Sequence, residues 1–319
     1  MQQHPENSPF SKLLGQQRAK SLLERSLISG RIAHAYLFRG PGGVGKKLFA
    51  AAMAKALNCR TAGPSKACEQ CVSCRKYLSG NHPDYLVESP EKEAIKIERI
   101  RELSKALSYP PYESERRVIV LENVHTMRAE AANCLLKTLE EPPPGNVLIL
   151  TAETSKNVLP TIRSRCQIIP FFPLNITETA QILRDDHGID GEQAQLLARL
   201  SEGSPGKALL LDKTDMINTW KGVTEVLNEP GYLEDRHCPT ILKWAQHMAD
   251  LKENLPPLLG LLRIWLRDML DDDSGIASLP HRSRERVFAG MAAIDRAEQE
   301  LARNCNRALV CEILLFRLQ

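Results

Sequence analysis

The stretch Gly40-Pro41-Gly42-Gly43-Val44-Gly45-Lys46-Lys47 follows a short apolar run, Ala35 to Phe38, and precedes an alanine-rich run that reaches Leu57. A strand, a glycine-rich turn and a helix in this order form a phosphate loop. The glycines let backbone N–H groups face an anion, and the following helix adds its positive N-terminal end. The sequence therefore predicts a nucleotide-binding α/β domain. Its candidate nucleotide-binding residues are Gly40, Gly42, Gly43, Gly45, Lys46 and Lys47.

One residue of this phosphate loop, residues 40–47, departs from the usual pattern. Lys46 is placed to reach the β- and γ-phosphates, but the pattern then requires Ser or Thr, whose hydroxyl holds Mg²⁺. Lys47 stands there instead. Because an ammonium group repels a divalent cation, we expect a loop that binds ATP or ADP but is poorly equipped to hydrolyse it.

The composition sets broad limits on the kind of protein. The chain has 319 residues, enough for two or three domains, and its 43% hydrophobic and 25% charged residues are ordinary for a globular protein. The net charge of +3 is too small to indicate nucleic-acid binding through bulk electrostatics. The first residues lack the pattern of a signal peptide, and no apolar run reaches membrane-spanning length. We therefore expect a cytoplasmic protein with no membrane partner.

Four of the nine cysteines are closely spaced. Nine is an odd number, and in a chain without a secretory signal it favours thiols or metal ligands over disulfides. Cys59, Cys68, Cys71 and Cys74 have the spacing C-x8-C-x2-C-x2-C, and four thiolates at this density can surround one Zn²⁺ tetrahedrally. An iron–sulfur cluster or a redox pair are the alternatives, although the spacing is not that of ferredoxins. We expect one structural zinc that stabilises an insertion, residues 59–74, too short for a core of its own.

A second buried strand, Val118 to Leu121, is followed by Glu122 and Asn123. In phosphate-loop ATPases this strand ends in an Asp that binds Mg²⁺, and a following acid orients water. Glu122 can approach a metal through water, but the carboxamide of Asn123 cannot act as a general base. This departure points in the same direction as Lys47: hydrolysis is not expected.

Several motifs together resemble the clamp-loader subunits of bacterial DNA polymerase III, which belong to the AAA+ family. The motifs are His34-Ala35-Tyr36-Leu37-Phe38, the four-cysteine insertion, Leu135 to Pro143 and Ser164-Arg165-Cys166. They cover about the first half of the chain, and the remainder matches in helical layout more than in motif. The resemblance implies a fold, a division into domains and a set of partners.

The resemblance implies three domains. An AAA+ nucleotide-binding α/β domain with the zinc insertion is expected over residues 1–172, a small three-helix lid over 173–212, and an all-α collar domain over 213–319. Within the lid, Asn175 with Glu178 predicts a capped helix start, and Asp190 and Ser204-Pro205 predict two further starts. In the collar, five helices are predicted to begin near Asp215, Pro239, Pro256, Arg282 and Arg307.

Two types of subunit in this family carry the zinc module and the Ser-Arg-Cys motif: a motor that hydrolyses ATP and a rigid stator that does not. The chain departs from the motor at Lys47, at Asn123, at Glu153 after the third strand, Val147 to Thr151, and at Gly206, where the motor carries Arg. We therefore expect a stator with no ATPase activity of its own, inside a complex that is a DNA-directed DNA polymerase. An ATP-hydrolysing motor subunit is the alternative. A stand-alone DNA-binding protein is a second alternative, which the 5% aromatic content disfavours.

The resemblance also assigns a role to Arg165. As an arginine finger in trans, it would meet the γ-phosphate bound by an adjacent motor subunit. If the segment is extended, Arg163 would point to the opposite face. The plainer alternative is an ion pair between Arg165 and a nearby carboxylate. The implied partners are the motor (gamma/tau) and delta subunits in a five-subunit ring, with the sliding clamp and primed DNA reached through the complex.

Overall fold

The computed structural model describes residues 8–61, 67–90, 94–154, 158–214, 216–228, 238–270 and 283–318. The chain divides into two compact units, Met1–Lys207 and Ala208–Gln319. The predicted division into three domains remains a prediction.

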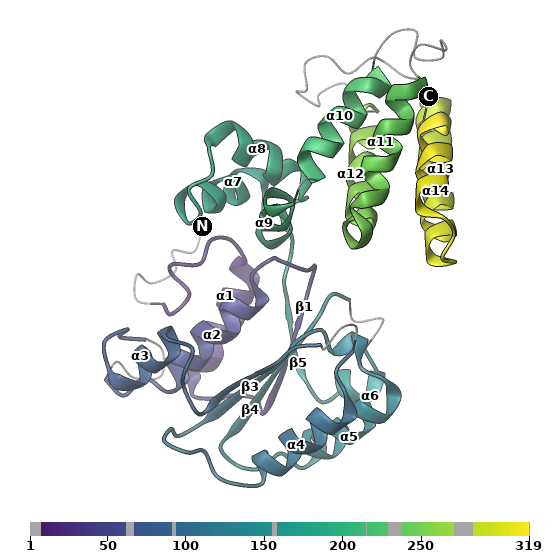
Figure 1. Cartoon of the computed structure of the whole chain (residues 1–319). Helices are drawn as coiled ribbons and strands as arrows, with labels where there is room; N and C mark the ends of the chain where they lie inside the picture. Colours follow the sequence, from purple (N-terminus) through teal and green to yellow (C-terminus); the bar gives the residue numbers. More distant parts are fainter. Residues whose placement is uncertain are drawn as a thin grey trace. The chain divides into compact units, whose positions relative to one another are not determined.

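The first unit is built on a five-stranded parallel sheet. Its strands are β1 (Ala35–Arg39), β2 (Tyr85–Glu88), β3 (Arg117–Leu121), β4 (Asn146–Ala152) and β5 (Gln167–Pro170), in the spatial order β2-β3-β4-β1-β5. The phosphate loop therefore leaves the carboxyl end of β1, which lies between β4 and β5 (Figure 1). The buried runs predicted for β1, β3 and β4 are strands as expected. Strand β2 was not predicted, because it has only four residues and these are only partly buried.

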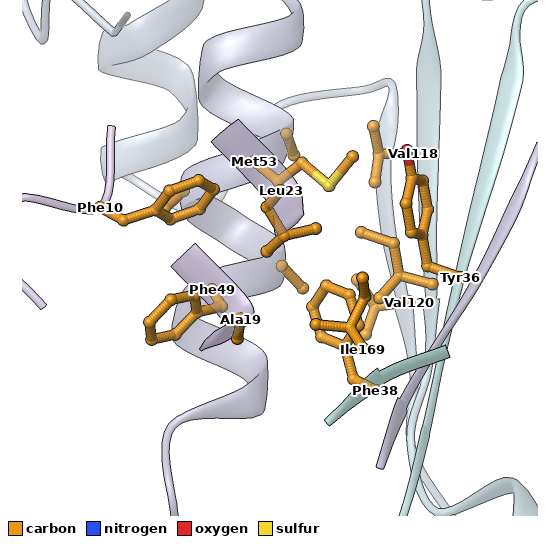
Figure 2. Close-up of a cluster of buried hydrophobic side chains, with 14 of the residues drawn as sticks. Phe10, Ala19, Leu23, Tyr36, Phe38, Phe49, Met53, Val118, Val120 and Ile169 are labelled. Carbon is orange, nitrogen blue, oxygen red and sulfur yellow. The ribbon is translucent and has the colours of Figure 1, made fainter. Parts of the chain in front are cut away.

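Helices cover both faces of the sheet. One face carries α1 (Gln17–Ser29) and α2 (Lys46–Leu57); the other carries α4 (Ile97–Leu107) and α5 (Ala129–Glu140) (Figure 1). Alternate residues of each strand serve the two cores, because side chains in a strand point to opposite faces in turn. Tyr36 and Phe38 of β1 belong to the α1–α2 side, shown in Figure 2, and Leu37 belongs to the α4–α5 side.

Two short helices complete the α/β region. The helix α3 (Val72–Leu78) begins directly after Cys71 and contains Cys74, and α6 (Pro160–Arg163) connects β4 to β5. Between β3 and α5 the chain forms a single 3₁₀ turn, η1 (Val124–Thr126). These connections carry two of the candidate sites, the cysteine cluster and Arg165.

The segment predicted to form the lid begins with two capped helices, α7 (Ile176–Asp185) and α8 (Gly191–Leu200). The Asn175 side chain accepts a hydrogen bond from the Glu178 N–H at 2.6 Å, and the Glu178 carboxylate accepts one from the Asn175 N–H at 3.3 Å. This reciprocal pair is the capping box predicted from the sequence, and Asp190 caps α8 as predicted. The third helix, α9 (Pro205–Lys213), starts in the first unit and continues into the second.

The second unit is helical throughout its described residues. Its elements after α9 are α10 (Met216–Asn228), α11 (Cys238–Asp250), the 3₁₀ turn η2 (Lys252–Asn254), α12 (Leu255–Asp268), α13 (Arg284–Ala302) and α14 (Arg307–Arg317). Three of the predicted starts are thus correct within two residues. The other two, Asp215 and Arg282, lie outside the described residues. Over the described part of the chain, no helix is both long and apolar enough to cross a membrane.

Candidate functional site

The phosphate loop closes on itself around the Lys46 side chain. Gly43 and Gly45 have φ angles of +73° and +97°, a left-handed conformation that side chains rarely adopt, and Gly45 leads directly into α2. Lys46 is 7% exposed, and its Nζ donates to the carbonyl oxygens of Gly40 at 2.5 Å and Pro41 at 2.6 Å. The cation that would meet a phosphate is therefore bound to carbonyl groups of the loop.

Lys47 contacts the residue that follows β3. Its Nζ lies 3.0 Å from Glu122 Oε1, and the other carboxylate oxygen of Glu122 accepts a hydrogen bond from Ser89 Oγ at 2.6 Å. Both oxygens of Glu122 are thus engaged by the chain. In a working phosphate-loop site this region holds Mg²⁺. The residues present do not fit Mg²⁺, because the Lys47 ammonium group is paired with the Glu122 carboxylate that would otherwise approach the ion.

Asn123 lies beside this ion pair in a left-handed conformation. Its φ angle is +53°, which Asn adopts more readily than most residues, and its backbone N–H donates to Thr151 Oγ1 on β4 at 3.0 Å. A carboxamide has no lone pair basic enough to take a proton from water. Asn123 is therefore held in place through its backbone, and its side chain offers no general base.

The start of α9 lies directly against the phosphate loop. Ser204 Oγ donates to Gly42 O at 2.8 Å, and the Gly206 N–H donates to Gly43 O at 2.9 Å. The approach requires glycine at both positions: a Cβ on Gly206 would lie 2.7 Å from Gly43 Cα, and one on Gly43 would lie 2.4 Å from Ser204 Oγ. From the sequence, Gly206 could be identified only as a missing arginine, and this contact could not be predicted, because 162 residues separate Ser204 from Gly42.

Glu153 brings a carboxylate to the same loop. A Cβ on Gly42 would lie 3.0 Å from Glu153 Oε1, so the carboxylate faces the loop at close range. Burial lowers the pKa of Lys46, and the charge of Glu153 opposes this shift. A carboxylate beside the loop repels a phosphate group, whereas the neutral residue expected of a motor subunit at this position would not.

The four cysteines of the insertion form one cluster. All four sulfur atoms lie within 4.8 Å of one another, and Cys68 Sγ and Cys74 Sγ are 3.9 Å apart. Two thiolates bound to one Zn²⁺ at about 2.3 Å in a tetrahedron are about 3.8 Å apart, so the donor set fits this ion. Residues 62–66, between the first and second ligands, lie outside the described part.

Backbone N–H groups hold the sulfur atoms in place. The N–H of Cys68 donates to Cys59 Sγ at 3.3 Å, that of Cys71 to Cys68 Sγ at 3.2 Å, and that of Cys74 to Cys71 Sγ at 3.4 Å. Hydrogen bonds from Thr61 and from backbone N–H groups lower the pKa of Cys68 to about 6, whereas burial raises the pKa of Cys74 to about 12. Donors aimed at sulfur stabilise thiolates, the form that binds metal.

A buried polar network connects this cluster to the sheet. Ser73, next to Cys74, contacts His82 Nε2 at 3.2 Å, and burial lowers the pKa of His82. Asp84 accepts the backbone N–H groups of residues 112, 113 and 114 at 2.6, 2.9 and 3.0 Å, and its Oδ1 lies 3.6 Å from Arg117 Nε. The network anchors the insertion to β3.

Arg165 lies in a turn between α6 and β5. Its N–H donates to Ile162 O at 3.1 Å, so the segment is not extended, and the condition under which Arg163 would point to the opposite face is not met. The reason is Pro160, which starts a helical turn. Arg165 Nη2 lies 2.7 Å from Glu140 Oε1 at the end of α5, and Nη1 donates to Thr161 O at 2.9 Å. The alternative to an arginine finger, an ion pair between Arg165 and a nearby carboxylate, is therefore present within the chain.

Comparison with known proteins places the chain in a family. A family model described as "DNA polymerase III, delta subunit" matches residues 15–175. The chain is 36% identical to DNA polymerase III subunit delta′ of Bacillus subtilis over 262 residues, which are 82% of this chain and 78% of the relative. The chain belongs to the delta′ family of DNA polymerase III subunits. The prediction of a clamp-loader subunit of this polymerase is thereby confirmed.

The delta′ family shares sequence with a second type of subunit. The chain is 38% identical to DNA polymerase III subunit tau of Escherichia coli over 63% of this chain, but it spans only 32% of that subunit's length. A solved structure of a gamma subunit-related protein from Thermotoga maritima covers 95% of this chain and is itself covered to 99%, with a TM-score of 0.50 and 19% identity. That likeness confirms the predicted fold class.

Proposed function

We propose that this delta′ chain is a stator: a subunit that takes part in loading the sliding clamp without hydrolysing ATP. The observation that carries the proposal is the ion pair between Lys47 and Glu122. It puts a cation of the chain where a motor subunit needs a divalent metal. Asn123 adds the loss of a general base, and each lost group typically lowers turnover by a factor of about 10² to 10⁴.

The lid contact supports the same proposal. In a motor subunit, the lid must respond to the nucleotide that the loop holds. Here the Gly206 N–H is bonded to Gly43 O, and Lys46 Nζ is bonded to Gly40 O and Pro41 O. A nucleotide that binds would have to replace these bonds, and it would then remain without turnover. In a stator, bonds within the chain and not bonds to nucleotide would set the position of the lid relative to the phosphate loop.

An ATPase assay tests the proposal. The purified full chain with ATP and excess Mg²⁺ should show no turnover above background. In the reconstituted complex, Lys46→Ala should leave clamp loading almost intact, because the loop performs no chemistry. Turnover by the isolated chain, or a large loss of loading with Lys46→Ala, would contradict the proposal. The corresponding lysine variant of the motor subunit is the positive control and should abolish loading.

The second part of the proposal concerns a neighbouring subunit. Arg165 acts in trans as an arginine finger toward nucleotide held by a motor (gamma/tau) subunit. Its side chain is 35% exposed, within reach of a partner, and a guanidinium group binds phosphate oxygens through paired donors. Its place next to Cys166, in a turn with a fixed backbone, would give the finger a defined starting position.

The remaining parts concern the metal and the assembly. Cys59, Cys68, Cys71 and Cys74 hold one structural zinc, which supplies folding energy to the insertion. The protein works in the cytoplasm beside motor and delta subunits in a five-subunit ring, and reaches the sliding clamp and primed DNA through that complex. Size-exclusion chromatography with and without these subunits tests the assembly.

A motor subunit is the second candidate function. The 38% identity to the tau subunit of Escherichia coli over 208 residues favours it. The ATPase assay separates the two: a motor hydrolyses ATP and loses activity with Lys46→Ala, and a stator does neither.

A further inference from the structure

The guanidinium group of Arg165 already has an anionic partner within the chain. Nη2 lies 2.7 Å from Glu140 Oε1, and Nη1 donates to Thr161 O at 2.9 Å and contacts Ser164 Oγ at 3.4 Å. The side chains of Arg165 and Glu140 are 35% and 50% exposed. The ion pair therefore lies where solvent, or an anion of another molecule, can reach it.

We propose that Glu140 is a positioning residue that holds Arg165 against the end of α5 and is exchanged for the γ-phosphate of a neighbouring subunit's nucleotide. The inference rests on the proposed function, because it takes Arg165 to act in trans. Glu140 thus sets how easily the finger engages ATP, and it keeps the guanidinium group paired when the neighbour holds ADP.

The charges favour such an exchange. A carboxylate carries one negative charge, whereas a terminal phosphate carries more and offers three oxygen atoms to the same fork of donors. An exposed ion pair with one short contact contributes little free energy, so its loss costs little. A buried pair would resist exchange, because separating it leaves an unsolvated charge.

The backbone confines the change to the side chain. In the turn that carries Arg165, the Ser164 N–H donates to Pro160 O at 2.9 Å and the Arg165 N–H to Ile162 O at 3.1 Å. Ile162 is 1% exposed and anchors the turn in the core. Arg165 can therefore leave Glu140 by rotating its side chain while the turn stays in place.

The experiment measures binding of the full chain to a motor subunit by surface plasmon resonance. The motor subunit is loaded either with AMP-PNP, a non-hydrolysable ATP analogue, or with ADP. Glu140→Gln should tighten binding to the AMP-PNP form about two- to five-fold and leave binding to the ADP form unchanged, because the competing carboxylate is removed. Glu141→Gln is the matched control: it removes the same charge one residue away, and its carboxylate has no ion pair among the described residues. It should behave as the wild type.

The double variant separates this effect from a general structural one. In an Arg165→Ala background, Glu140→Gln should change nothing, because its effect acts through Arg165. Weaker binding of Glu140→Gln to the AMP-PNP form, or an equal effect with and without Arg165, would overturn the inference. If Arg165→Ala leaves unchanged the ratio of the affinities for the AMP-PNP and ADP forms of the motor subunit, the proposed arginine finger is contradicted. If Arg165→Ala lowers the ratio and Glu140→Gln equals the wild type, only the role of Glu140 fails.

Discussion

Lys47 Nζ and Glu122 Oε1 lie 3.0 Å apart, so the first turn of α2 is joined by charge to the end of β3. Each residue alone departs from a hydrolytic site, and together they compensate each other. The carboxylate that would approach a metal is neutralised by the chain, and the ammonium group that replaces the metal-binding hydroxyl gains a partner. The ion pair thus places a cation of the chain at the carboxylate that would otherwise approach a metal.

Zinc content should depend on the cysteine cluster. The purified chain is expected to contain about one zinc and no iron. Cys71→Ser should lower the zinc content to near zero and reduce the melting temperature by several degrees, because it removes a ligand and the acceptor of the Cys74 N–H. Elemental analysis and calorimetry measure both. Cys305→Ser, an exposed cysteine outside the cluster, is the control and should change neither.

Arg165→Ala should reduce DNA-stimulated ATP hydrolysis by the reconstituted clamp loader. A finger supplied in trans contributes a factor of about 10³ to 10⁵ at one site. Since only one of several motor sites would face this subunit, the bulk rate should fall partially and clamp loading should fall more. Arg163→Ala is the control, because Arg163 is exposed at the end of α6 and has no ion pair among the described residues. Unchanged rates in an assembled complex would rule out the finger.

Gly206→Ala should destabilise the first unit. The added Cβ would lie 2.7 Å from Gly43 Cα, so the lid must move away from the phosphate loop, at a cost of about 1–3 kcal/mol. Urea denaturation measures the change in free energy of unfolding, and hydrogen exchange should show faster exchange at the Gly206 amide. Gly191→Ala, where a Cβ meets nothing within 4 Å, should be neutral or slightly stabilising. Equal effects of the two substitutions would contradict the close contact.

Asp84 should make stability depend on pH. Burial raises its pKa, but three backbone N–H groups and Arg117 outweigh this and hold the pKa below its ordinary value. Because the folded-state pKa is lowered, ionised Asp84 stabilises the folded state fully at pH values above its unfolded-state pKa of about 3.9. This stabilisation is lost as the pH falls through the folded-state pKa. Asp84→Asn should cost about 3 kcal/mol near neutral pH, and the wild type should lose more stability than the variant between about pH 5 and pH 2. Parallel pH profiles of the two proteins would refute this role.

Much of the fold followed from local patterns. The β-branched runs at Val118 and Val147 predicted buried strands, and Asn175 with Glu178 predicted a capped helix, since both signals lie within a few neighbouring residues. The cysteine spacing likewise predicted a cluster that the structure brings within 4.8 Å.

The contacts that distinguish this candidate site are not local. Lys47 with Glu122, Glu153 with the phosphate loop, and Gly206 with Gly43 each join segments that the sheet and the lid bring together. The sequence identified several of these residues as departures from a pattern, but not their partners. Near Arg165 the condition on which Arg163 would face the opposite side, an extended segment, is not met, because Pro160 starts a helical turn.

The close approach of Gly206 to Gly43 has an evolutionary consequence. An arginine at position 206 would bring its Cβ into the backbone of the loop before its guanidinium group reached any phosphate. On the proposed function, restoring a hydroxyl at position 47 and an acid at position 123 would therefore not suffice for hydrolysis, since the segment that carries Gly206 must first separate from the loop. For the proposed stator, single substitutions along such a path would lower stability without returning activity, so selection could not restore hydrolysis one step at a time.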